Sequence, residues 1–102
     1  MDKTRMIDEK LAKKILELMH KSSRTLDEAL LKSSEELGEL VSANFGMKSY
    51  KKDSVEHLQE EAIDFLQCAI GAYVLIQEKY PFDGEEIMDK KLTKWEAKYT
   101  KQ

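Results

Sequence analysis

The sequence has few of the residues that interrupt helices or cross-link chains. It contains one proline, four glycines and one cysteine among 102 residues. A single cysteine, Cys68, cannot form a disulfide within the chain. Scarce proline and glycine, together with abundant Leu, Ala, Glu and Lys, favour long helices. No alternating apolar and polar pattern of useful length predicts a strand, so we expect an all-α protein.

Long apolar runs and an excess of one charge are also missing. The longest largely apolar run, residues 62–76, is shorter than a membrane span and contains Asp64 and Gln67. The opening MDKTRMIDEK has no apolar signal core. We therefore expect a cytoplasmic protein without a membrane partner. Seventeen basic and twenty acidic residues give a net charge of −3 and are interspersed, so duplex nucleic acid is not an expected partner.

Capping residues divide the chain into four predicted helices within one domain, residues 1–102. Thr25 and Glu28 predict a capping box, and Gly46 a left-handed helix end. Asp53 or Ser54 is expected to cap the third helix. Pro81 ends that helix, and Asp83 begins the next capping signal. The expected ranges are about 5–21, 25–46, 54–80 and 83–99.

Apolar spacing predicts which faces of these helices pack together. The third helix is apolar over most of its circumference after Asp64, and Gly71 and Ala72 allow close approach of another helix. Four short helices offer few surfaces to cover it, so we expect a homodimer or homotetramer. The other expected inward residues are Met6, Leu11, Ile15, Leu18 and Met19; Leu26, Leu30, Leu37, Leu40 and Val41; and Ile87, Met88, Leu92 and Trp95.

Two pairs of acidic residues flank the polar loop between the second and third helices. Glu36 and Glu39 are three residues apart, as are Glu61 and Asp64, so the members of each pair share a helix face. In an antiparallel hairpin the two pairs would differ in height by only about 2 Å. The four carboxylates are therefore expected to converge.

The surroundings of these acids favour convergence over exposure to solvent. Glu36 is in line with Ala29 and Ala43, which are small enough to let another helix approach, and Asp64 begins an apolar run. Four converging carboxylates would repel one another, whereas a hard divalent cation removes the penalty. We therefore predict a Mg²⁺ site, for which Mn²⁺ could substitute. Glu35 and Glu60 are expected to point to other faces.

The segments LKSSEELGELVSA and LQEEAIDFLQCAI resemble the MazG-like nucleoside triphosphate pyrophosphohydrolases, in which an EExxE motif precedes ExxD on the next helix. The resemblance covers about residues 25–99. It implies a four-helix, oligomeric MazG-like bundle whose antiparallel hairpin carries the acidic site. It also implies that Glu36, Glu39, Glu61 and Asp64 are the metal ligands and the catalytic residues. The implied reaction splits a nucleoside triphosphate between its α and β phosphates, giving a monophosphate and pyrophosphate.

Basic residues on the last helix are candidates for binding the remaining phosphates, as in members of that family. Lys91, Lys94 and Lys98 recur on one face, although a solvated lysine face would have the same spacing. The loop lysines, Lys48, Lys51 and Lys52, are weaker candidates because a loop should be mobile. No Phe, Trp or Tyr precedes Phe45, so the preferred base is left open.

Two other functions remain compatible with the sequence. Phosphoribosyl-ATP pyrophosphohydrolases resemble this chain in length, expected fold and acidic motifs, and would use the same ligands. A non-catalytic helical oligomerisation module would instead pair its acids with lysines. A di-iron carboxylate bundle needs two Glu-x-x-His motifs on facing helices, and only Glu17 to His20 has that pattern.

Overall fold

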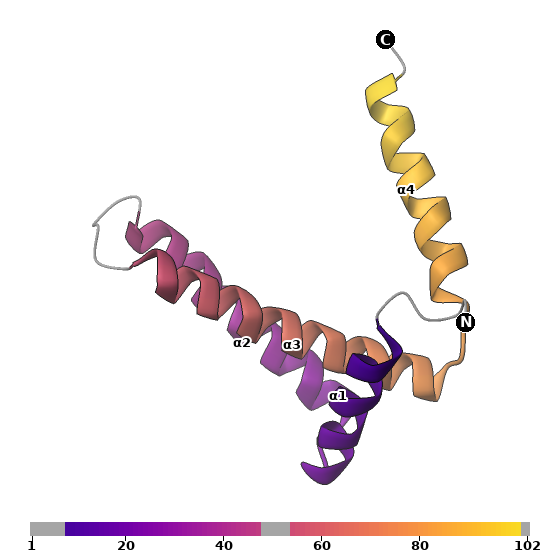
Figure 1. Cartoon of the computed structure of the whole chain (residues 1–102), viewed down its shortest axis with the longest axis horizontal. Helices are drawn as coiled ribbons and strands as arrows, with labels where there is room; N and C mark the ends of the chain where they lie inside the picture. The colour runs from indigo at the N-terminus through magenta and orange to yellow at the C-terminus, as the bar shows by residue number, and fades with distance from the viewer. Residues whose placement is uncertain (1–7, 48–53, 101–102) are drawn as a thin grey trace.

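Four α-helices make up most of the computed structural model, which describes residues 8–47 and 54–100 (Figure 1). No strand occurs in these residues, so the all-α prediction is confirmed. None of the helices in this part of the chain has the length and apolar character that a membrane span requires. The helices are α1 (Glu9–Lys21), α2 (Leu26–Phe45), α3 (Val55–Lys79) and α4 (Gly84–Thr100).

Three helix starts follow the capping residues that the sequence offers. The Thr25 hydroxyl accepts a hydrogen bond from the Glu28 N–H at 3.1 Å, and the Glu28 carboxylate accepts one from the Thr25 N–H at 2.9 Å. This is the predicted capping box. Ser54, one of the two residues predicted, caps α3, and Asp83 accepts a hydrogen bond from the first turn of α4.

Two predicted boundaries are wrong. The first helix begins at Glu9 and not at about Arg5, because the Asp8 carboxylate caps it by accepting two N–H groups of the first turn; Arg5 lies outside the described residues. Gly46 is right-handed, with φ −57° and ψ −44°, because the chain continues in a helical conformation beyond Phe45. The left-handed residue is Ser23, with φ 54°, in the turn between α1 and α2.

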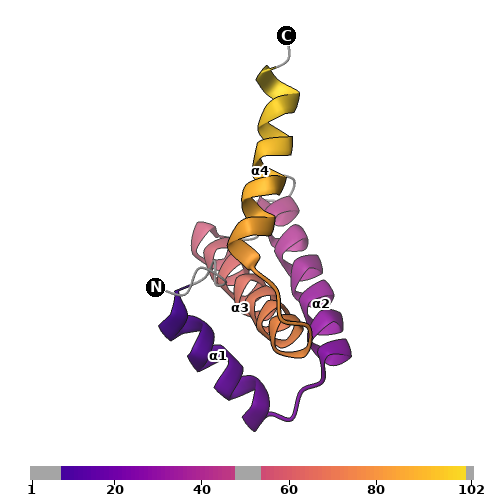
Figure 2. The same cartoon turned by 90° about the vertical axis from the view of Figure 1, so that its right-hand side faces the viewer.

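The hairpin of α2 and α3 forms the centre of the fold, with α1 beside α3 (Figures 1 and 2). The buried residues of α2 recur every seven positions: Ala29, Glu36 and Ala43. This is the alignment expected from the sequence, and the two alanines allow α3 to approach closely. The predicted leucine stripe is only partly buried, since Leu30 and Leu37 remain 47 % and 44 % exposed. The alanine line, and not the leucines, therefore faces α3.

α1 covers the small residues of α3. A Cβ built on Gly71 would lie 3.0 Å from Cε of Met19, so glycine permits this contact. Ala72 belongs to the buried cluster that contains Met19 and Ala29. These two α3 residues, expected to allow close approach of another helix, are thus covered by α1 within one chain. Leu11 and Leu18, expected inward on α1, are 46 % and 49 % exposed, and Met6 lies outside the described residues.

α4 projects away from the hairpin (Figure 1). Its connection to α3 is held by an edge-to-face contact between Tyr73 and Phe82, with ring centroids 5.7 Å apart. The predicted inward orientation of its apolar residues is wrong for the described part of the chain, where these side chains remain about half exposed. The packing of all four helices into one bundle remains a prediction. Ile87, Met88, Leu92 and Trp95 are 41–59 % exposed.

The uncovered apolar side chains predict self-association. Leu31, Trp95 and Tyr99 are between 59 % and 72 % exposed. Trp95 and Tyr99 are four residues apart on α4 and share a helix face with the exposed Met88 and Leu92, and exposed apolar patches of this kind mark interaction sites. We expect light scattering at micromolar concentration to give at least twice the 11.8 kDa chain mass, and Trp95→Glu to lower it. A wild-type monomer under these conditions would contradict the prediction.

Candidate metal centre

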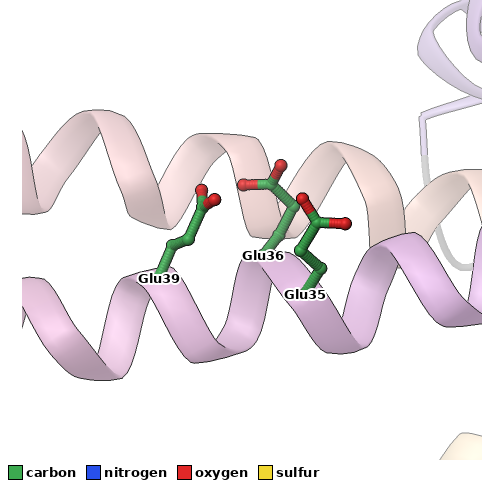
Figure 3. A group of neighbouring side chains, drawn as sticks. All are labelled: Glu35, Glu36 and Glu39. Atoms are coloured by element: carbon green, nitrogen blue, oxygen red, sulfur yellow. The ribbon is translucent and has the colours of Figure 1, made fainter.

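Carboxylates from both helices of the hairpin meet near its middle. Ligand oxygens of Glu36, Glu61 and Asp64 lie within 4.8 Å of one another, as do those of Glu35, Glu36 and Glu39. Figure 3 shows the α2 members on one side of their helix, with Glu36 and Glu39 extending toward α3. Glu36 belongs to both groups and links them. The structure therefore groups Glu36 with Glu61 and Asp64, and groups Glu39 with Glu36, but the two groups do not merge into one that holds all four predicted acids.

Burial separates Glu36 and Glu61 from ordinary surface acids. Glu36 is only 8 % exposed, and the Glu61 side chain 13 %. One oxygen of each has a nearby nitrogen: Lys32 Nζ is 3.3 Å from Glu36 Oε1, and His57 Nε2 is 3.7 Å from Glu61 Oε1. The other oxygen of each, Oε2, is buried without a hydrogen-bond partner among the described residues. Buried polar atoms are nearly always satisfied, so an ion is a natural partner.

The charges in the cluster act on Glu39. The negative charge of Glu36 raises the pKa of the Glu39 carboxyl, and a hydrogen bond between the two has the same effect. Smaller contributions come from desolvation and from the charges of Glu61 and Glu35. Like charges that face one another favour the protonated form of one of them. A divalent cation would reverse this preference, because carboxylates bind metal in the ionised form.

A pH-dependent effect of magnesium follows from the raised pKa of Glu39. A carboxyl whose pKa is higher in the folded state binds its proton more tightly there, so ionising it destabilises the fold. Without metal, the contribution of Glu39 to stability should therefore fall as pH rises from the usual Glu pKa through the raised value. Magnesium should oppose this loss. Melting curves between about pH 4 and 7, in EDTA and in magnesium, would test it; equal pH profiles would contradict it.

The sequence reasoning missed three neighbours of the acid cluster. Glu35, expected to point elsewhere, lies in the group with Glu36 and Glu39. Lys32 lies 3.3 Å from both Glu35 and Glu36, and hydrogen bonds to them raise its pKa, Glu36 having the larger effect. His57 lies beside Glu61. The spacing of Lys32 and Glu36, and of His57 and Glu61, is four residues, the signal by which the sequence could have indicated both contacts.

The predicted phosphate-binding lysines lie elsewhere. Lys91, Lys94 and Lys98 are exposed on α4, which extends away from the hairpin that carries the acids (Figure 1). From Asp64 to the end of α3 the helix rises by about 22 Å before the chain turns into α4. One chain therefore does not bring these lysines to its own acid cluster. The three loop lysines, Lys48, Lys51 and Lys52, lie outside the described residues.

The ligand set fits a hard divalent cation. All four predicted ligands supply carboxylate oxygens, which Mg²⁺, Mn²⁺ and Ca²⁺ prefer. Opposite oxygens around Mg²⁺ are about 4 Å apart, given bonds of 2.0–2.1 Å. The oxygens of Glu36, Glu61 and Asp64, which lie within 4.8 Å of one another, have a spacing comparable with that span. The Oε2 atoms of Glu36 and Glu61 have no hydrogen-bond partner among the described residues, and as metal ligands they would gain one in such an ion.

Asp64 differs from the two buried glutamates in its surroundings. It is exposed, and no described Lys, Arg or His forms an ion pair with it.

Comparison of the chain with protein-family models, with curated proteins and with solved structures finds no match. The resemblance to MazG-like enzymes therefore depends on the motif and its helical context, and remains a prediction.

Proposed function

We propose that this chain is a magnesium-dependent nucleoside triphosphate pyrophosphohydrolase. Its substrates would be ribo- or deoxyribonucleoside triphosphates, cleaved between the α and β phosphates. One observation carries the proposal: carboxylate oxygens of Glu36, Glu61 and Asp64 group together across the hairpin, and Glu36 and Glu61 each have a buried oxygen without a hydrogen-bond partner among the described residues. The motif resemblance selects this reaction from among those that a carboxylate-bound cation can support.

The proposed roles follow from charge and position. Glu36, Glu39, Glu61 and Asp64 would hold the cation, and one of these acids would accept a proton from the attacking water. When bound, magnesium would offset phosphate charge and lower the pKa of a coordinated water. The new bond would join the water oxygen to the α phosphorus, and the bond from that phosphorus to the bridging oxygen would break. The products are a nucleoside monophosphate and pyrophosphate, and no protein nucleophile is required.

Cations for the remaining phosphates have two proposed sources. Lys32 is already beside the acid cluster, with Glu35 and Glu36 as its partners. Lys91, Lys94 and Lys98 would act only if α4 of one subunit reached the acid cluster of another, because they lie far from their own. Self-association through the exposed apolar face of α4 provides that opportunity.

A substrate panel tests the proposed function directly. The protein would be incubated with each common (d)NTP and with phosphoribosyl-ATP, with magnesium or with EDTA. We expect pyrophosphate and the nucleoside monophosphate as products, in magnesium only. Activity confined to phosphoribosyl-ATP would replace the proposed substrate by that close alternative, and the absence of hydrolysis of any compound would contradict the proposal.

One observation favours a non-catalytic oligomerisation module as second candidate. The apolar face of α4 is exposed along its length, as expected of a helix that packs against another subunit. That reading requires the acids to be neutralised by basic residues, and it predicts that magnesium leaves the melting temperature unchanged. Stabilisation by magnesium would count against it, since only a ligand of the folded state raises the melting temperature.

A further inference from the structure

A small cavity between α1 and α3 opens beside the acid cluster. Its volume is about 210 Å³. One wall is apolar and comes from α1, and the other residues are polar or polarisable and come from α3 and the turn before α2. The lining residues are Ile15, Leu18, Met19, Arg24, Gln67 and Cys68.

Cys68 connects this cavity to the acids. It follows Asp64 by four residues, which places the two one helical turn apart on the same side of α3. Partial burial raises the pKa of the Cys68 thiol, and the negative charges of Glu36 and Asp64 raise it further, whereas Arg24 lowers it. The thiol is thus within electrostatic reach of two predicted metal ligands and of the arginine across the cavity. A ligand in the cavity would have the acids at one side.

The lining suits a flat ring with a polar edge. Ile15, Leu18 and Met19 offer an apolar surface against which a ring can pack. Gln67 supplies an amide donor and acceptor, and Arg24 supplies several donors in a fixed plane. Arg24 forms no ion pair with a described residue, so its donors are not committed to a carboxylate. Ligand sites commonly combine an apolar lining with a few such polar groups.

We propose that this cavity binds the base of the substrate nucleotide, with Gln67 and Arg24 contacting its polar edge. The inference depends on the proposed function. It assigns base preference, which the sequence left open, to the residues of this cavity. The cavity is smaller than the 300–1,000 Å³ typical of sites for drug-sized ligands, so it accommodates the base alone. The sugar would bridge to the acids, where the phosphates meet the cation.

The single cysteine provides a reporter of occupancy. Cys68 is the only thiol in the chain and lines the cavity, so the rate of its modification by N-ethylmaleimide can be followed by mass spectrometry. The probe ligand is a nucleoside triphosphate with a methylene group between the α and β phosphorus atoms, which cannot be hydrolysed there. At about ten times its dissociation constant, mass action should slow modification about tenfold. Inorganic triphosphate at inhibitory concentration should leave the rate nearly unchanged, because it lacks a base.

The outcomes separate this inference from the proposed function. If nucleotides are hydrolysed but the analogue does not protect Cys68, or inorganic triphosphate protects equally well, the base binds elsewhere and the inference is overturned. If no nucleotide is hydrolysed but free nucleosides protect Cys68, the cavity still binds a base, and only the proposed function fails. Absence of both hydrolysis and protection would overturn both.

Substitution of Gln67 gives a second test. Gln67→Leu should raise KM for the preferred nucleotide with a smaller change in kcat, and should alter the ratio of kcat/KM between purine and pyrimidine substrates. Gln77→Leu is the matched control, because Gln77 lies ten residues further along α3, about 15 Å away, and should change neither. An unchanged KM and unchanged base preference for Gln67→Leu would overturn the inference.

Discussion

Asp64→Asn should abolish most of the hydrolytic activity without unfolding the protein. The substitution removes one ligand charge and keeps the side-chain shape. Loss of a residue outside the ligand set commonly costs 10–100-fold in metal enzymes, so losing a ligand should cost at least about a hundredfold in kcat. The variant should also lose most of the rise in melting temperature caused by magnesium. Without metal it should be as stable as wild type or slightly more stable, because repulsion within the cluster falls.

The sign of the metal-free stability change separates this account from its alternative. If Asp64 were paired with a lysine, the same substitution would remove an exposed ion pair and lower the stability by up to about 1 kcal/mol, with or without magnesium. Among the described residues, no Lys, Arg or His forms an ion pair with Asp64. Glu60→Gln is the control, since Glu60 is exposed on α3 and lies outside both acid groups. An Asp64→Asn variant that is less stable without metal yet active with it would refute the assignment.

Gly71→Val should strongly destabilise the fold by pushing α1 away from α3. Even a Cβ at this position would lie 3.0 Å from Cε and 3.2 Å from Sδ of Met19. The two further methyl groups of valine would crowd the Met19 side chain more, and overpacking of this kind costs about 1–3 kcal/mol. For a domain of this size the melting temperature should fall by roughly 5–20 °C. Thermal unfolding followed by circular dichroism measures the change.

A second helical glycine provides the control. A Cβ on Gly38 would meet nothing within 4 Å, so Gly38→Ala should gain the helix propensity of about 1 kcal/mol without a clash. Gly71→Ala should gain less, because the Met19 side chain must shift. Adding Met19→Ala to Gly71→Val should recover part of the lost stability. A Gly71→Val protein with the same melting temperature as the wild type would contradict the packing of α1 on α3.

Local signals in the sequence predicted the helices well because capping is a local interaction. Thr25 with Glu28, Ser54 and Asp83 satisfy N–H groups within a few residues of themselves, so no other part of the chain is needed. Gly46 was misassigned for a related reason. Glycine permits a left-handed helix end but does not require one, and the helix simply continues.

Tertiary packing was predicted less well. Apolar periodicity marks a face that prefers burial but does not say which segment covers it. The expected leucine stripe of α2 remains half exposed, because the line of Ala29, Glu36 and Ala43 lets α3 approach more closely. On α4 the apolar residues are about half exposed, and none of the other described helices packs closely against them. The apolar periodicity of a sequence does not distinguish a face buried within one chain from a face buried between chains.

The acid cluster was predictable because its geometry follows from two regular features. Spacing of three residues sets each pair on one helix face, and similar distances from the hairpin loop set both pairs at one height. The cavity that we assign to the base was not predictable, since it combines α1, α3 and the turn at Arg24. Contacts of that kind depend on the crossing of helices, which sequence periodicity does not specify.

Binding of Mn²⁺ followed by electron paramagnetic resonance tests the central claim most directly. The signal of the free aqueous ion diminishes when it binds, so a titration reports binding without relying on catalysis. The account predicts at least one site per chain in the wild-type protein, competed by Mg²⁺ and lost in Glu36→Gln, in which the buried carboxylate at the centre of both acid groups is replaced. A wild-type protein that leaves the Mn²⁺ signal unchanged, or equal binding by wild type and Glu36→Gln, would contradict it.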